Sequence, residues 1–170
     1  MLTKNIENAL NKQIRIEAES SQTYLAMACW AEVSGLEGIA QFMFTQSDEE
    51  RAHMLKLIKY VNERGGHALV SELKAPTTTY GTFKEMFEAL YKHEVFVSDS
   101  INELVHITFA EKDYATHNFL QWYVAEQIEE EATAKSILDK INLIGDDKGG
   151  LYLFDRDIQQ AAIAAAIPKV

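Results

Sequence analysis

Four amphipathic segments of this sequence are each interrupted near mid-length by an ionisable or amide residue. Apolar residues recur at steps of three and four over residues 4–34, 38–64, 82–110 and 113–144, the spacing of one face of a helix. The interruptions are Glu17 in the first segment, Glu50 and His53 in the second, Glu94 in the third, and Gln127 and Glu130 in the fourth. Because an unpaired buried carboxylate is costly, four such interruptions at matching depth predict one shared polar layer in the core of a helical bundle.

The spacing of these residues predicts how the helices pair. The separation of Glu17 and Glu50 along the chain (50 − 17) equals that of Glu94 and Gln127 (127 − 94). The two halves of the chain also share one offset, from Glu17 to Glu94 (94 − 17) and from His53 to Glu130 (130 − 53). In an antiparallel hairpin, residues equidistant from the turn face each other, here about 25 Å from it. The chain is therefore expected to be a doubled helical hairpin with one level polar layer.

The connection between the two hairpins, residues 66–81, is long for neighbouring helices. Fully extended it reaches roughly 50 Å, more than the ~40 Å length of the second helix, so it can run the length of the bundle. A short fifth helix is expected near residues 154–166. The predicted fold is all-α, a four-helix bundle with one long crossover loop over residues 1–145. Residues 146–170 are expected to add a loop and the fifth helix to the same domain.

Composition excludes several classes of function. The net charge of −10 opposes nucleic-acid binding, which needs clustered Lys and Arg. No apolar run is long enough to predict a spanning helix, and no signal peptide is apparent, so a cytoplasmic protein without a membrane partner is expected. Cys29 is the only cysteine, which rules out an intrachain disulfide and a CxxC site. We expect its side chain to be buried.

The residue types of the polar layer indicate a metal site. Carboxylates with one histidine and no thiolate suit iron or manganese, and also admit zinc. E50-R-A-H53 is one Glu-x-x-His pair, and Q127-I-E-E130 has the same spacing with different ligands. Glu126, Glu129 and Glu130 share one helical face, where like charges repel unless a cation lies between them. Glu131 is expected to point into solvent.

The sequence resembles the bacterial non-haem ferritins over nearly its whole length. The resemblance is carried by LNKQIRIEAESSQTYLAM, QSDEERAHM, YKHE, INEL and NFLQWYVAEQIEEE. Ferritin-like bundles use one glutamate from each of two helices and a Glu-x-x-His pair from each of the other two. This chain keeps that arrangement except at Gln127 and Glu130.

The resemblance implies a ferroxidase centre that oxidises ferrous iron with dioxygen. It implies a first iron held by Glu17, Glu50 and His53. It implies a second iron held by Glu50, Glu94 and Glu130, with Gln127 beside the pair. It implies a third iron site formed by Glu49, Glu126, Glu129 and Glu130. It also implies that Tyr24 lies next to the di-iron centre. The weaker ligands at Gln127 and Glu130 favour a site that passes iron on to a mineral core.

The resemblance also implies self-assembly into a hollow shell of 24 subunits. In that arrangement the apolar tail, DRDIQQAAIAAAIPKV, meets its copies at four-fold axes; a helix packed on its own bundle is the alternative. Haem is not expected, because the haem-ligating methionine of the bacterioferritins is here Ala52.

Particular residues of the sequence argue for or against each competing function. A rubrerythrin-like peroxidase would need a CxxC iron module, and a purely structural bundle gives no reason for level carboxylates on all four helices. A di-iron oxidase acting on a small organic substrate stays open as the alternative, because sequence does not exclude a substrate cavity.

Overall fold

Four long helices form the bundle, as the apolar periodicity predicts. They are α1 (Lys4–Val33), α2 (Glu37–Glu63), α3 (Phe83–Ala110) and α4 (Tyr114–Ile144). The structure, a computed structural model, describes the backbone of residues 1–165 and the side chains of residues 1–160. Three helices are capped by the residue just before them, whose side chain accepts a hydrogen bond from a backbone N–H of the first turn. These residues are Thr3 for α1, Thr82 for α3 and Asp113 for α4.

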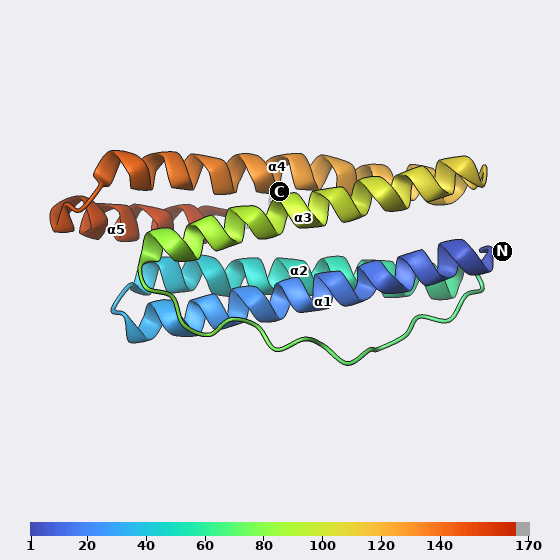
Figure 1. The fold of residues 1–170 in the computed structure, drawn as a ribbon, viewed down its shortest axis with the longest axis horizontal. Helices are drawn as coiled ribbons and strands as arrows, with labels where there is room; N and C mark the ends of the chain where they lie inside the picture. Colours follow the sequence, from blue (N-terminus) through green and yellow to red (C-terminus); the bar gives the residue numbers. More distant parts are fainter. Residues whose placement is uncertain (166–170) are drawn as a thin grey trace.

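The helices form two antiparallel hairpins, α1 with α2 and α3 with α4 (Figure 1). The segment between α2 and α3 runs along the outside of the bundle from one end to the other, so α3 starts at the end where α2 also starts. The predicted four-helix bundle with one crossover loop is therefore confirmed. Over residues 1–165 no helix is both long and apolar enough to cross a membrane.

The buried apolar side chains form two clusters, one on each side of the polar layer. The cluster toward the α1–α2 turn includes Met27, Ile39 and Phe87. The other includes Leu10, Leu57 and Leu120. Glu17 and Glu50 are absent from both clusters although each is almost fully buried. The polar layer thus interrupts the core, and its charged groups are surrounded by apolar side chains above and below.

The fifth helix, α5 (Lys148–Ala165), begins six residues earlier than the sequence predicted. The pair Gly149 and Gly150 suggests a break, but the Asp147 carboxylate accepts hydrogen bonds from both of their backbone N–H groups, at 3.3 and 2.8 Å. That contact satisfies two donors of the first turn, where glycine costs little.

Helix α5 folds back onto α2 of its own chain (Figure 1). Phe154 and Ile158 are buried in the apolar cluster near the α1–α2 turn. The Asp155 carboxylate accepts from the backbone N–H groups of Gly38 and Ile39, at 3.2 and 2.9 Å, and so caps α2. A Cβ at position 38 would lie 1.8 Å from the Asp155 carbonyl oxygen, so only glycine permits this approach. The tail predicted to meet its copies is residues 155–170, and the side chains of residues 161–170 lie outside the described residues, so that contact stays a prediction.

Candidate metal centre

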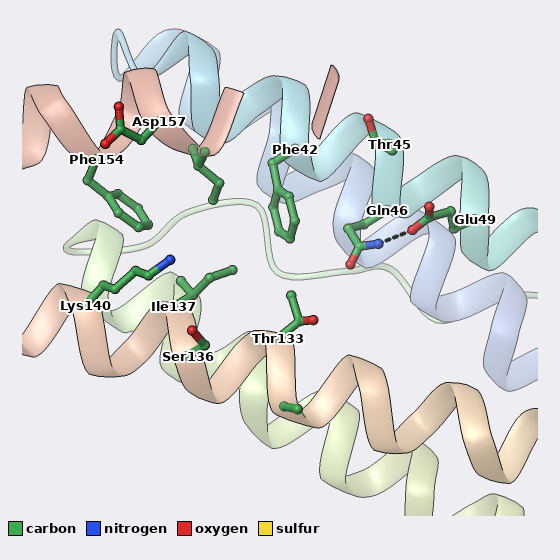
Figure 2. A pocket seen from close by; sticks show the side chains of 12 residues that line it. Phe42, Thr45, Gln46, Glu49, Thr133, Ser136, Ile137, Lys140, Phe154 and Asp157 are labelled. Carbon is green, nitrogen blue, oxygen red and sulfur yellow. Dashed lines mark hydrogen bonds between the residues drawn. The ribbon is translucent and has the colours of Figure 1, made fainter. Parts of the chain in front are cut away.

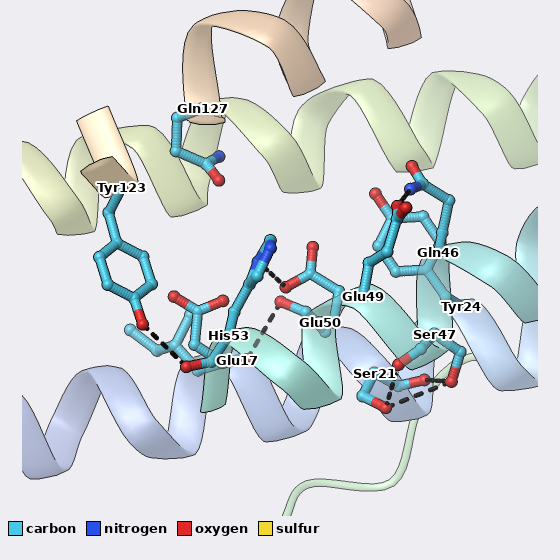
Figure 3. A network of polar contacts seen from close by, with 12 residues as sticks. Glu17, Ser21, Tyr24, Gln46, Ser47, Glu49, Glu50, His53, Tyr123 and Gln127 are labelled. Carbon is cyan, nitrogen blue, oxygen red and sulfur yellow. Dashed lines mark hydrogen bonds and ion pairs between the residues drawn. The ribbon is translucent and has the colours of Figure 1, made fainter. Parts of the chain in front are cut away.

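Glu17, Glu50 and His53 converge between α1 and α2 (Figure 3). One oxygen of each carboxylate and one ring nitrogen of His53 all lie within 4.8 Å of one another, close enough to bind one ion. The His53 Nδ1 atom is 3.5 Å from Glu50 Oε2. Their side chains come together because Glu50 and His53 are one turn apart on α2, facing the point of α1 that lies equally far from the turn.

Two oxygens of this group are buried without a partner. Glu17 and Glu50 are 1% and 2% exposed, and neither Glu17 Oε2 nor Glu50 Oε2 has a hydrogen-bond partner among the described residues. Burial, and then the neighbouring carboxylates, raise the pKa of Glu17 and of Glu50 well above the ordinary value. A divalent cation would reverse both effects, because it replaces the missing partner and attracts the charged form. The donor set fits such an ion.

Glu94 of α3 is held differently. The Tyr24 hydroxyl of α1 donates to Glu94 Oε1, and the Gln127 amide of α4 donates to Oε2 at 3.3 Å. Glu94 is fully buried, and burial raises its pKa, while these two hydrogen bonds lower it. Burial and the charge of Glu94 raise the pKa of Tyr24, so its hydroxyl stays protonated and donates. The predicted contacts of Tyr24 and Gln127 with the layer are present.

Glu130 connects the layer to the surface. Burial raises its pKa to about 8, and Glu94, Glu49, Glu126 and Glu129 add to that shift. Glu49 and Glu129 are exposed, whereas Glu126 and Glu130 are half-buried. The charges of Glu49, Glu126 and Glu129 thus act on Glu130, but among the described residues only Glu17, Glu50 and His53 bring ligand atoms within 4.8 Å of one another, so the third site stays a prediction.

The sequence matches the ferritin-like domain family over residues 7–144, most of the chain. The chain belongs to the ferritin family. A probable bacterial non-heme ferritin-like protein of Haemophilus influenzae is 48% identical over 158 residues, 93% of this chain and 96% of that protein. The bacterial non-heme ferritin of Campylobacter jejuni is 43% identical over 164 residues, 96% of this chain and 98% of that protein.

Solved structures agree with the sequence comparison. An open pore ferritin from Archaeoglobus fulgidus superposes on this ferritin with a TM-score of 0.92 and 42% identity, covering 94% of this chain and 98% of that one. The similarity spans the four-helix bundle and most of the remaining chain.

Two residues of this ferritin differ from the sequence expectation. Glu131 is half-buried and accepts a hydrogen bond from the Ser98 hydroxyl, so the prediction of a solvated side chain was wrong. Cys29 is exposed, not buried as predicted, because its position on α1 lies outside the stripe that faces the core.

Sequence reasoning did not predict how Gln13 and Tyr123 contact residues of the polar layer. The Gln13 amide donates to Glu17 Oε1 at 2.9 Å, and the Tyr123 hydroxyl donates to the backbone carbonyl of His53 at 2.8 Å. The Trp122 ring meets the His53 ring edge to face, with centroids 5.2 Å apart. The position of Gln13, one helical turn before Glu17, was the available signal, but a polar residue beside an apolar stripe usually faces solvent.

A cavity of about 590 Å³ lies beside the centre, between α2, α4 and α5 (Figure 2). Phe42, Ile137 and Phe154 supply apolar walls, and Gln46 and Glu49 border its end nearest the polar layer. Glu17, Glu50, His53 and Glu94 are not among its lining residues. An organic molecule in this cavity would therefore not touch the four innermost groups.

Proposed function

We propose that this ferritin oxidises ferrous iron with dioxygen inside its helical bundle and stores the product as a hydrated ferric oxide mineral. The observation that carries the proposal is the buried Glu17–Glu50–His53 group, in which two carboxylate oxygens have no hydrogen-bond partner in the part of the chain that the structure describes. A bundle that only had to fold would be more stable with apolar residues there. The names of the similar proteins, bacterial non-heme ferritins, support iron as the substrate.

Glu50 is the proposed bridge between two ferrous ions. It lies beside Glu17 and His53, and the charges of Glu94 and Glu130 also raise its pKa, so it is close to both groups. Glu17 and His53 would complete the first ion site. Glu94 and Glu130 would complete the second, with Gln127 next to it and Tyr24 hydrogen-bonded to Glu94. Each of the two ferrous ions loses one electron, and one dioxygen accepts both electrons together with two protons and leaves as hydrogen peroxide.

The carboxylates around Glu130 give the oxidised iron a route toward the surface. Glu49, Glu126 and Glu129 lie close enough to Glu130 to raise its pKa, so an ion that leaves the second site meets further oxygen ligands toward the surface. Gln127 and Glu130 bind more weakly than a second Glu-x-x-His pair would, because an amide carries no charge and an imidazole is absent. We infer that this weakness lets the product leave.

Iron storage requires a hollow protein shell, which is the assembly that membership of the ferritin family leads us to expect. We propose that residues 1–145 and 146–170 fold as a single domain and that this chain assembles with copies of itself into a hollow cytoplasmic shell of 24 subunits. The superposition on solved ferritins supports self-assembly. No haem takes part in this proposal, since position 52 is alanine.

The proposed bridge is tested by Glu50→Ala, with Glu63→Ala as control because Glu63 is an exposed glutamate of the same helix. Both are mixed aerobically with about two ferrous ions per chain. We expect oxidation to slow by more than about 100-fold in Glu50→Ala and to stay unchanged in Glu63→Ala, with both oligomers intact. Wild-type oxidation by Glu50→Ala would overturn the assignment.

A further inference from the structure

Gln13 is a buried amide whose hydrogen bonds face two different elements. It is 1% exposed on α1. Its Nε2 atom donates to Glu17 Oε1 at 2.9 Å, and its Oε1 atom accepts from the Ser100 hydroxyl of α3 at 2.7 Å. Because an ionised carboxylate only accepts hydrogen bonds, the amino end of the amide has to face Glu17, and the carbonyl end then accepts from the Ser100 hydroxyl. Ser100 therefore holds the far end of the amide in place from a second helix.

The hydrogen bond from Gln13 has a specific effect on Glu17. It occupies Oε1 and leaves Oε2 without a hydrogen-bond partner among the described residues, and Glu17 offers one oxygen to the group that Glu50 and His53 complete. This donor therefore fixes the position of the Glu17 carboxylate before any ion arrives.

The second hairpin has no equivalent of this amide. The offset that relates Glu17 to Glu94 relates Gln13 to Leu90 (90 − 13 against 94 − 17), a buried apolar residue of α3. Glu94 takes its hydrogen bonds from Tyr24 and Gln127 instead, and these occupy both of its oxygens. An amide that leaves one oxygen free is therefore a property of the first site alone.

We propose that Gln13, held in place by Ser100, is a positioning residue that sets the affinity of the Glu17–Glu50–His53 site for its ion. This inference rests on the proposed function and assigns to Gln13 no contact with iron. The alternative is a purely structural role, in which Gln13 joins α1 to α3 and its loss changes stability only.

The test is an anaerobic titration with Co²⁺ up to one ion per chain, followed by the visible absorption of the bound ion. The variants are Gln13→Leu, Ser100→Ala and, as control, Asn11→Leu. Asn11 is another buried amide of α1, but it bonds the crossover loop at His67 and Leu69 and does not contact Glu17. Thermal unfolding without metal is measured for each variant.

We expect Gln13→Leu to weaken the first Co²⁺ by about 10- to 100-fold. Ser100→Ala should weaken it by less, about threefold to tenfold, because Gln13 keeps its hydrogen bond to Glu17 but loses the one that holds the other end of the amide. Ser100 is half-buried, so its variant tests the proposal even if Gln13→Leu does not fold. Asn11→Leu should lower the unfolding temperature and leave the Co²⁺ affinity within about twofold of wild type.

Wild-type affinity in the Gln13 and Ser100 variants, or an equal loss in Asn11→Leu, would overturn the positioning role. Glu50→Ala in the same titration separates this from a failure of the proposed function. If the wild-type protein binds no Co²⁺, or if Glu50→Ala binds it equally well, the metal site itself is wrong and the role of Gln13 falls with it.

Discussion

The hairpins α1–α2 and α3–α4 place polar residues at the same depth of the bundle but leave their glutamates in different states. In the first hairpin Glu17 and Glu50 each keep one buried oxygen without a partner among the described residues. In the second, both oxygens of Glu94 accept hydrogen bonds, from Tyr24 and Gln127. An ion that binds the first group gains ligands at no cost in hydrogen bonds, whereas an ion at the second must compete with them.

This difference teaches how one bundle can both bind and release a metal. The free oxygens and His53 make the first site the tighter one, and the occupied oxygens with Gln127 make the second site the looser one. Loose binding next to the exposed carboxylates around Glu130 suits an ion in transit.

The largest expected effect separates the two hairpins directly. Glu17→Ala should weaken binding of the first divalent ion by more than about 100-fold, because it removes a ligand from the tighter site. Glu94→Ala should weaken it by less than about threefold and abolish binding of the second ion. Stepwise Co²⁺ affinities from calorimetry provide the measurement. Equal losses in the two variants would show that the sites are not distinct.

The stability of the metal-free protein should fall as the pH rises, because the carboxylates of the polar layer repel one another. Glu130 has a folded pKa of about 8 against an ordinary value of 4.5, and the pKa of Glu17, Glu50 and Glu94 is raised in the same direction. A raised carboxyl pKa adds stability below the unfolded value, and that stability is lost as pH rises through the folded value. Between about pH 5 and 8 the metal-free protein should lose on the order of 1–4 kcal/mol.

The measurement is the unfolding temperature in a chelator across that range, with Glu130→Gln alongside. The variant should show a shallower decline than wild type, and added Zn²⁺ should stabilise the wild type most at the upper end of the range. A wild-type protein that becomes more stable toward pH 8 without metal contradicts the described charge distribution.

Restoring symmetry should convert the second site into a copy of the first motif. The double variant Gln127→Glu with Glu130→His gives α4 a Glu-x-x-His pair at the spacing of Glu50 and His53. We expect it to tighten the second ion by about tenfold and to slow the passage of iron to the mineral while the first turnover stays fast. Stopped-flow oxidation over repeated iron additions tests this. Unslowed later turnovers would mean that ligand strength does not control release.

The smallest effect concerns the ends of the helices, where the hairpins also differ. Helices α3 and α4 are capped by Thr82 and Asp113, the residues that precede them, whereas α2 is capped by Asp155 of α5. Asp155→Ala should destabilise the chain by about 1 kcal/mol, measured by chemical unfolding. Asp157→Ala is the control, because Asp157 pairs only with the exposed Arg156 among the described residues. Equal stability of the two variants would show that Asp155 of α5 does not stabilise α2 as a cap.

Most of the fold followed from periodicity and spacing. The apolar steps of three and four locate α1 to α4 closely at both ends, and the equal spacing within each half correctly brings Glu17 to Glu50 and Glu94 to Gln127. These features are predictable because a helix repeats its faces regularly and a hairpin pairs residues by distance from the turn.

The misses at the start of α5, at Glu131 and at Gln13 share a physical cause, which is that a single side chain decided the outcome. Asp147 starts α5 despite two glycines, and no periodicity reports it. The Ser98 hydroxyl holds Glu131 against the bundle, and the Ser100 hydroxyl holds Gln13 from another helix. Each contact joins residues far apart in the sequence or depends on the orientation of a polar group, which residue spacing alone does not determine.

The measurement that tests the central claim most directly is the amount of iron retained per chain. The large oligomer is loaded aerobically with ferrous salt in excess and separated from free iron, and bound iron is counted. Storage behind an oxidising centre predicts many irons per chain, because the side chains of Glu17, Glu50, His53, Glu94 and Glu130 can hold only two or three. Saturation at two or three would contradict storage and would favour a di-iron oxidase acting on an organic substrate.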